Sequence, residues 1–515
     1  MLRIFFPKYD LDTFRVQQSR QFWLTLFGLL MFTAYVGKSM VGVDAGLEVL
    51  AWFIYGAGII ATFIQPRYGI YLTVFFSLAG DMLMLKWYPF NKNFSSAESI
   101  FFVNSGLKFS ALELYLAIIL LAWGVRLFAQ KKLTFRPGSI GFPVAFFMAM
   151  VLYGVVYGIM RHGDMTIALW ESRSMLYLPI IYFMIVNLIE NRQQVNNLVW
   201  SAMLANIFQG FTGVWYYLFY PGGNKKGSDG IMEHSASIHL DAMFVYVFAL
   251  FLFNGPKSKR NVLALFCIPA LWAYLVNQRR ASFVSLGVAL ILLGVALFRQ
   301  NRRVFYMITP PIVVIATLFL GATWNNSSIL GLPARGIKSA LGIGVNDRDE
   351  ASNVYREIEN INTNYTIHKV PLTGIGFGNK FLIIAPMPDI SFFDWWEYIT
   401  HNSIMWVWMQ LGIVGFLSML LMVGSTVAIG VRVYDRLPGG DYKAIGATML
   451  LYVIMHFVYA YVDMSWENQS MVFVGMATGV LGCLDRVMSK PVPQPKPRYR
   501  WMPVPAPEIV LEEEQ

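Results

Sequence analysis

Two short polar motifs carry side chains that could do chemistry in an otherwise apolar sequence. His401 and Asn402 open the apolar stretch "THNSIMWVWMQLGIVGFLSML" (400–420), and Arg279 and Arg280 lie in "NQRRAS" (277–282). A histidine with its ordinary pKa of about 6.5 can accept a proton near neutral pH. Arginine stays charged and holds phosphate with a planar fork of donors. Each motif also has a plainer interpretation: a polar helix cap for the histidine, and phospholipid headgroup binding for the arginines.

The composition indicates that these motifs lie in a membrane protein. Of the 515 residues, 56% are hydrophobic and 14% are charged, whereas soluble proteins carry about 25% charged residues. The apolar runs are about 17 to 25 residues long, which is the length that spans a bilayer as a helix. We therefore predict an all-α polytopic membrane protein with about 14 transmembrane helices. The predicted spans are 22–38, 45–64, 68–86, 109–127, 139–160, 174–189, 195–220, 238–254, 261–277, 281–298, 304–322, 402–431, 443–462 and 467–485.

The distribution of charge predicts the topology. The sequence pI is about 9.3, but with the N-terminus in the cytoplasm 24 of the 40 Lys and Arg fall on the cytoplasmic side, as topology favours. This explanation needs no nucleic acid. We expect a cytoplasmic N-terminal segment (1–21) with no signal-cleavage pattern, helices 1–11 (22–322), a large extracytoplasmic loop (323–400), helices 12–14 (401–485) and a Pro-rich, disordered cytoplasmic tail (486–515).

The predicted loop has internal patterns of its own. Apolar residues recur at helical spacing in "DEASNVYREIENINTNYTI" (349–367), which predicts a helix that lies on the membrane surface or caps a cavity. The glycines of "PLTGIGFGN" (371–379) suit a tight turn packed on the helices better than a nucleotide loop, because no strand precedes them. The aromatic residues of "SFFDWWEYITHNS" (391–403) are typical of an interfacial belt, and they also suit stacking on sugar faces.

Ionisable residues within or beside the predicted spans gather toward the outer leaflet. Such residues usually face a cavity or a partner, so their shared side predicts a polar cavity open outward. The residues are Asp81, Glu113, His239, Asp241, Arg279, Arg280, His401, His456 and Asp463. His234, His239 and Asp241 do not have the i, i+4 spacing that would put two histidines on one helix face, so we predict no metal site.

The sequence resembles the O-antigen ligase and O-antigen polymerase family of bacterial envelope glycan assembly. Three elements carry the resemblance in the family's order: "QRRAS" (278–282), "YREIENINTNYTIHKVPLTGIGFGN" (355–379) and "HNSIMWVWMQLGIVGFLSML" (401–420). The first resembles a Ser-Arg-Gly/Ala element at a helix end, the second a loop ending in spaced glycines, and the third a His-Asn helix. The resemblance covers roughly residues 200 to 480.

The resemblance implies a GT-C-like membrane glycosyltransferase at the outer face of the bacterial inner membrane. Such proteins move a saccharide from undecaprenyl diphosphate to an acceptor hydroxyl, with inversion and without metal or cofactor. His401 corresponds to the family's essential histidine and Arg280 to one of its key arginines. We expect His401 to take the hydroxyl proton, Arg280 to stabilise the departing diphosphate, and Asn402 to orient the sugar or His401. We also expect Arg279 to bind the substrate, together with an upstream basic residue, which is Lys225, Lys226 or Arg173.

Several alternatives stay open at this point. The acceptor is a glycan, a lipid or a protein, and ligase and polymerase are not distinguished. A solute transporter would also place ionisable residues in spans, although the outward bias and the lack of a clear inverted repeat favour the transferase. A non-catalytic scaffold would leave the placement of the arginines and the histidine unexplained.

Overall fold

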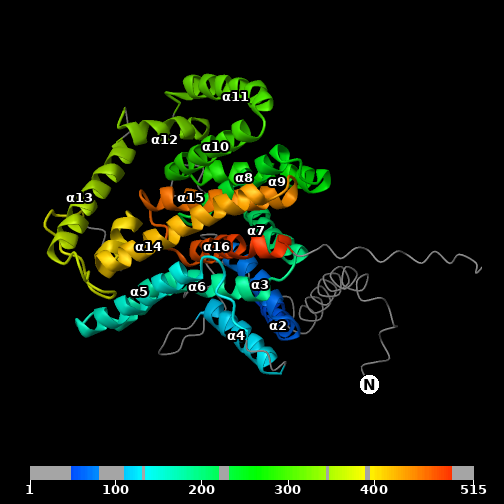
Figure 1. The fold of residues 1–515 in the computed structure, drawn as a ribbon. Helices are drawn as coiled ribbons and strands as arrows, with labels where there is room; N and C mark the ends of the chain where they lie inside the picture. The colour runs from blue at the N-terminus through cyan, green and yellow to red at the C-terminus, as the bar shows by residue number, and fades with distance from the viewer. Residues whose placement is uncertain are drawn as a thin grey trace, which may run out of the picture.

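The computed structural model describes residues 48–79, 110–129, 134–219, 231–326, 328–343, 347–388 and 395–489. Within these ranges the regular structure is helical and contains no strand (Figure 1). The helices are α2 (Glu48–Ile64), α3 (Pro66–Ala79), α4 (Ala111–Ala129), α5 (Gly141–Met160), α6 (Met165–Leu188), α7 (Arg192–Phe219), α8 (Ala236–Leu252), α9 (Lys257–Val276), α10 (Arg280–Gln300), α11 (Arg302–Thr323), η1 (Ile329–Gly331), α12 (Leu332–Leu341), α13 (Asp347–Lys369), α14 (Ser403–Arg436), α15 (Asp441–Ala460) and α16 (Asn468–Ser489).

Among the described residues, 8 helices are long and apolar enough to cross a membrane: α4, α5, α9, α10, α11, α14, α15 and α16. The apolar helix α8 is shorter, at 17 residues. The chain is therefore a multi-pass membrane protein, and the total of fourteen spans stays a prediction. The first predicted span (22–38), the N-terminal segment and residues 490–515 of the predicted tail lie outside the described residues.

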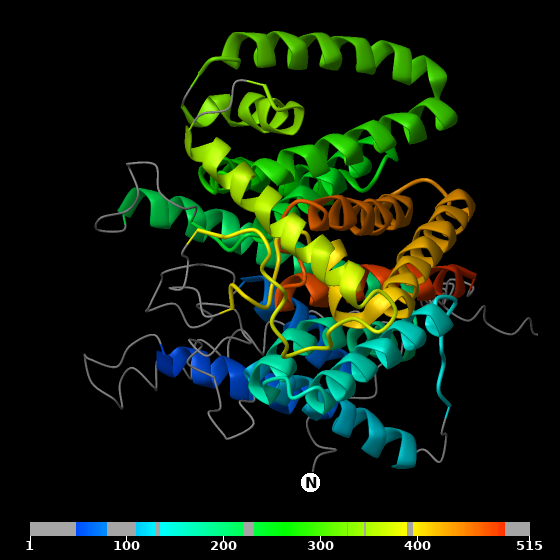
Figure 2. The same ribbon diagram turned by 90° about the vertical axis from the view of Figure 1, so that its left-hand side faces the viewer.

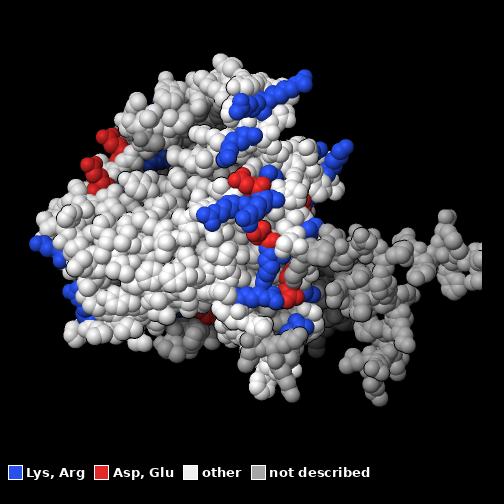
Figure 3. Space-filling model, viewed as in Figure 1, with Lys and Arg blue, Asp and Glu red and all other residues white. Residues whose placement is uncertain are grey.

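Charged side chains leave a broad uncharged surface around the middle of the molecule. In Figure 3, Lys and Arg gather with Asp and Glu at the right-hand end, where α9 and α11 begin and α10 and α14 end. These helix ends carry "KSKR", "RR", Arg299 and Arg436. The uncharged surface is what a helical protein presents to hydrocarbon, because an isolated charge there is expensive.

Close helix packing in the core depends on small residues. Gly475, Gly479 and Gly482 of α16 face α6, and a Cβ at Gly475 would lie 2.7 Å from the carbonyl oxygen of Leu178. Small residues at such spacing let two membrane helices approach closely. The van der Waals contacts between them then stabilise the pair, because the hydrophobic effect does not drive helices together in lipid. The resulting pair α6 and α16 forms the centre of the bundle (Figure 1).

Helix α14 is broken at Gly412, and the glycine turn is inserted at the break. Gly412 has φ 66° and ψ −174°, a conformation that only glycine adopts readily. The turn supplies the hydrogen bonds that the break leaves open: the Ile375 and Gly376 N–H groups donate to Met409 and Gln410 (2.8 and 3.0 Å), and Ile413 donates to Pro371 (2.9 Å). The predicted tight turn packed on the helices is confirmed.

The turn also packs against α5 without room for a side chain. Gly376 has φ +77°, and a Cβ there would lie 2.5 Å from the backbone N and Cα of Gly158. Beneath the turn, the buried Glu171 carboxylate of α6 accepts from the Gly378 N–H (2.6 Å) and from Gln410 Nε2 (3.0 Å). The first part of α14 is thereby fixed in position, and His401 lies directly before it.

The predicted helix in the segment 323–400 is confirmed as α13, which follows the shorter α12. Figure 2 shows α13 crossing the end of the bundle diagonally, between α12 and the start of α14. This end is opposite the end where the basic residues gather (Figures 1 and 3). Helix α13 therefore covers the face of the bundle at which α14 begins.

Candidate active site under α13

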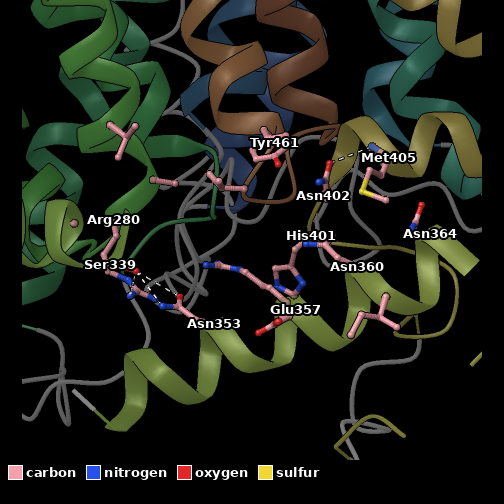
Figure 4. A pocket seen from close by; sticks show the side chains of 16 residues that line it. Arg280, Ser339, Asn353, Glu357, Asn360, Asn364, His401, Asn402, Met405 and Tyr461 are labelled. Carbon is pink, nitrogen blue, oxygen red and sulfur yellow. Dashed lines mark hydrogen bonds between the residues drawn. The ribbon is translucent and has the colours of Figure 1, made fainter. Parts of the chain in front are cut away.

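A cavity of about 740 Å³ lies between α13 and the bundle (Figure 4). Its walls come from the start of α10, from α12 and α13, from the start of α14 and from the connection between α15 and α16. The polar residues that line it are Arg280, Ser339, Asn353, Arg356, Glu357, Asn360, Asn364, His401 and Asn402. Val284, Ile361, Met405 and Val462 add apolar surface. The lining thus combines donors for anions and sugar hydroxyls with surface for an apolar chain.

His401 is held at this cavity by a buried carboxylate. Glu359 of α13 has a side chain only 2% exposed, and its Oε2 accepts from the His401 backbone N–H (2.7 Å) and faces His401 Nδ1 at 3.0 Å. A carboxylate at Nδ1 favours the tautomer that carries the proton there and leaves Nε2 as the proton acceptor. Tyr355 packs edge-on against the imidazole, with ring centroids 5.6 Å apart. Glu359 and Tyr355 therefore fix the orientation of the imidazole.

Asn402 caps the helix that follows His401. Its side-chain oxygen accepts from the Met405 N–H (3.1 Å), which satisfies one of the open donors at the start of α14. The cap makes the helix begin at Ser403, so His401 stands outside the helical turn and faces α13. Asn402 is buried and lines the cavity beside His401, a position from which it could orient the sugar or His401.

Arg280 begins α10 and reaches the same cavity. Its Nη1 donates to Ser339 Oγ of α12 (2.7 Å), and Ser339 in turn exchanges hydrogen bonds with Asn353 of α13. Figure 4 shows this chain of three side chains along one wall of the cavity, with His401 on the same α13 side. The structure therefore brings Arg280, His401 and Asn402 together.

A second arginine of the cavity was not predicted from the sequence. Arg356 of α13 lines the cavity, and its Nη2 lies 3.6 Å from Asp463 Oδ2. The apolar residues at helical spacing are not the most buried ones of this helix: Val354 and Ile361 are 48% and 49% exposed, whereas Glu359 is buried. The buried side of α13 therefore includes a charged residue. The available signal was the three-residue spacing of Arg356 and Glu359, which puts both on one helix face.

Two of the other predicted contacts lie away from the cavity lining. Arg173 of α6 is in an ion pair with Glu113 of α4, with Nε 2.6 Å from Oε1. Arg279 precedes α10 and is not among the residues that line the cavity. Burial and the Glu233 carboxylate raise the pKa of Glu467 to about 8, and the charge of Arg279 opposes part of this shift. Lys225 and Lys226 lie outside the described residues.

The remaining sequence motifs have local partners. His234 Nδ1 lies 3.3 Å from Asp463 Oδ1, and His239 Nε2 lies 3.2 Å from Ser470 Oγ. No group of three or more His, Cys, Asp or Glu side chains is arranged to hold a metal ion in the part of the chain that the structure describes. In the aromatic stretch, Trp395 stacks face to face on Trp170, with ring centroids 4.4 Å apart.

The segment of the chain that forms most of this cavity matches a known protein family. Residues 263–420 match the family model described as O-antigen ligase. This segment of the chain is therefore similar to O-antigen ligases. The matched segment runs from α9 into the first part of α14 and so contains Arg280, Arg356, Glu359 and His401. No curated protein shows significant sequence similarity to the chain. The match of this segment indicates an O-antigen ligase- or polymerase-type enzyme in a membrane.

Proposed function

We propose that the chain is a membrane glycosyltransferase that moves a saccharide from undecaprenyl diphosphate to an acceptor hydroxyl. The observation that carries the proposal is one cavity lined by Arg280, Arg356 and a histidine backed by the buried Glu359. A base and two fixed cations are what the transfer needs, because a hydroxyl proton must leave and negative charge grows on a diphosphate. The family match supports the same class of reaction.

In the proposed step the acceptor oxygen bonds to the anomeric carbon while the bond from that carbon to the diphosphate oxygen breaks. The electron pair of the broken bond stays on undecaprenyl diphosphate, next to Arg280 and Arg356. The hydroxyl proton passes to Nε2 of His401, and the Glu359 carboxylate at Nδ1 stabilises the imidazolium that forms. His401 later gives the proton to water. A single displacement of this kind inverts the anomeric configuration, and its charge is carried by the arginines without a metal ion.

We assign the diphosphate to Arg280 and Arg356 because both line the cavity. Asn402 orients His401 through the cap of α14. Arg279, one residue away from Arg280, adds positive charge at the same helix end. Arg173 would have to leave Glu113 in order to contact substrate. Lys225 and Lys226 precede the described segment that begins at Ile231, and we keep them as additional diphosphate contacts.

We place the protein in the bacterial inner membrane, with both termini in the cytoplasm and the cavity facing outward. The gathering of Lys and Arg at one end of the helices supports this orientation, because basic residues favour the cytoplasmic side. The cavity lies at the opposite end, under α13 (Figures 1 and 2). The carrier's apolar chain then enters from the bilayer beside Val284 and Met405, while the acceptor comes from outside.

The test is release of undecaprenyl diphosphate by the purified protein from lipid-linked glycans of the source cells. We expect release by the wild type, and about 100-fold slower release by Arg280→Ala and Arg356→Ala, because each removes a charge beside the leaving group. Arg436→Ala is the matched control, since Arg436 forms an exposed pair with Asp485 at the other end of the molecule. A folded wild type that releases no carrier from any native glycan would refute the proposal.

The products also separate the two enzyme types. A polymerase extends its own lipid-linked repeats into a ladder, whereas a ligase releases carrier only when a separate acceptor is added.

A transporter remains the second candidate because Asp241 and His456 are buried inside the bundle, with Asp241 beside Tyr274. Solute uptake into proteoliposomes that is lost in Asp241→Asn or His456→Ala, but not in His401→Ala, would favour it.

A further inference from the structure

Asp463 joins three parts of the chain next to the cavity. It lies in the connection between α15 and α16, where Tyr461 and Val462 line the cavity, and it is 3% exposed. Its Oδ1 faces His234 Nδ1 at 3.3 Å, and its Oδ2 accepts from the Tyr459 hydroxyl at 3.3 Å and lies 3.6 Å from Arg356 Nη2. One buried carboxylate thus contacts the segment before α8, the end of α15 and the covering helix α13.

The Asp463 carboxylate stays ionised in the folded protein. Burial alone would raise its pKa, but the charge and hydrogen bond of His234 and the charge of Arg356 hold the pKa below its ordinary value. The neighbouring Glu467 responds in the opposite sense, since the Asp463 charge is among the causes that raise its pKa. A fixed negative charge therefore faces Arg356 from the bundle side.

Helix α13 meets the bundle through two ionic contacts of opposite polarity. Arg356 of α13 faces Asp463 of the bundle, and Glu359 of α13 faces His401 of the bundle. The side chain of Asn362, by contrast, bonds within its own segment, to the backbone of residues 384 and 385. Because Arg356 and Glu359 are three residues apart, the two contacts fix both the rotation and the position of α13 over the cavity.

The same connection also holds the start of α14. The Asp463 carbonyl accepts from Ser403 Oγ (3.2 Å), and the Ser465 N–H donates to that hydroxyl (3.1 Å). Trp466 Nε1 donates to the Ser403 carbonyl (2.8 Å). Ser403 is two residues after His401. One short piece of backbone therefore sets the spacing between the histidine and Arg356.

We infer that Asp463 is a positioning residue that docks α13 on the bundle and aims Arg356 into the cavity. The inference rests on the proposed function for its effect on the reaction, but docking of α13 is a property of the fold alone. Removing the charge releases Arg356 and loosens α13, while Glu359 still holds the other contact. The variant is therefore expected to fold and to work slowly.

The experiment compares Asp463→Asn with Asp485→Asn in the full-length protein in lipid nanodiscs. Asp485 undergoes the same chemical change in an exposed ion pair with Arg436. We expect amide hydrogen exchange within 347–369 to rise at least about tenfold in Asp463→Asn, because a charge-assisted contact is lost. In Asp485→Asn the exchange should match the wild type. Unchanged exchange in Asp463→Asn would overturn the inference.

Carrier release supplies the second readout. Asp463→Asn should lower kcat/KM at least about tenfold in the wild-type background and have little further effect in the Arg356→Ala background, because both changes remove one interaction. Equal losses in the two backgrounds would mean general destabilisation and would contradict positioning through Arg356. Asp463→Glu should restore part of the activity.

Two outcomes keep this inference distinct from the proposed function. If the wild type releases no carrier, the proposed function fails, and hydrogen exchange alone decides whether Asp463 docks α13. If Asp463→Asn does not fold, Arg356→Gln breaks the same contact from the α13 side. Exchange within 347–369 that does not rise in Arg356→Gln would then overturn the inference.

Discussion

Replacing Glu359 by glutamine removes one negative charge beside His401 and leaves the shape of the side chain almost unchanged. In the wild type, Oε2 of Glu359 accepts from the His401 backbone N–H at 2.7 Å and faces Nδ1 at 3.0 Å. A glutamine oxygen in the same place can still accept both hydrogen bonds. The substitution therefore isolates what the charge contributes when His401 takes up a proton.

The magnitude follows from the burial of the contact. The Glu359 side chain is 2% exposed, so solvent screens the pair only weakly. Hydrogen bonds to charged groups contribute about 1.5–3 kcal/mol, against about 0.5–1.5 kcal/mol for neutral ones. Replacing the charged bond by a neutral one therefore costs about 1–1.5 kcal/mol in the transition state. Because each 1.4 kcal/mol corresponds to about a factor of ten, kcat should fall by roughly 5- to 10-fold. KM should change much less, because the Glu359 charge acts on the proton that His401 takes up in the transition state.

The assay is carrier release at saturating lipid-linked glycan, with a thermal melt to check folding. Glu350→Gln is the control, because Glu350 is exposed in the first turn of the same helix and does not line the cavity. If Glu359→Gln is folded and keeps the wild-type kcat, Glu359 does not assist His401, and the proposed role of the pair is wrong. A rise in KM alone would place Glu359 in substrate binding instead.

Two further predictions concern the glycine turn at Gly376 and the buried carboxyl group of Glu467. Gly376→Ala should cost about 2 kcal/mol or more and lower Tm, because φ +77° is strained for alanine and its Cβ would clash with the Gly158 backbone at 2.5 Å; Gly424→Ala in α14, where nothing lies within 4 Å of the new Cβ, should melt like the wild type. Glu467 keeps its proton up to about pH 8 in the folded protein, whereas an unfolded glutamate loses it near pH 4.3. Between these values the folded state binds more protons, so the free energy of unfolding falls as pH rises. Glu467→Gln should therefore melt above the wild type at pH 8.5, with the difference vanishing toward pH 4; a constant difference in Tm at all pH values would contradict this assignment.

The sequence predicted the site residues that stand at helix ends. His401 and Arg280 both precede long apolar runs, so hydropathy alone placed them at helix starts and topology placed them on one side. The neighbouring arginine shows the limit of this reasoning. Successive residues at a helix start point in different directions, and only the structure shows that Arg280 lines the cavity while Arg279 does not.

The sequence did not predict Arg356 and Glu359, because their partners are distant in the chain. Apolar periodicity identified α13 correctly as a helix but did not show that the buried Glu359 of this helix meets His401. Burial of a polar helix face is favourable only when polar groups elsewhere in the fold pair with it, and one sequence does not show those pairs. The break at Gly412 was also missed, because hydropathy runs continuously across it.

The most direct test of the central claim compares His401→Ala with His368→Ala for release of undecaprenyl diphosphate. His368 is an exposed histidine of α13 whose Nδ1 faces the Asn364 carbonyl of its own helix at 2.8 Å. If His401 is the base, folded His401→Ala should release carrier at least about 100-fold more slowly than the wild type, while His368→Ala stays within about twofold. Release by folded His401→Ala at the wild-type rate would contradict the account, because the cavity would then lack the base on which the proposed transfer depends.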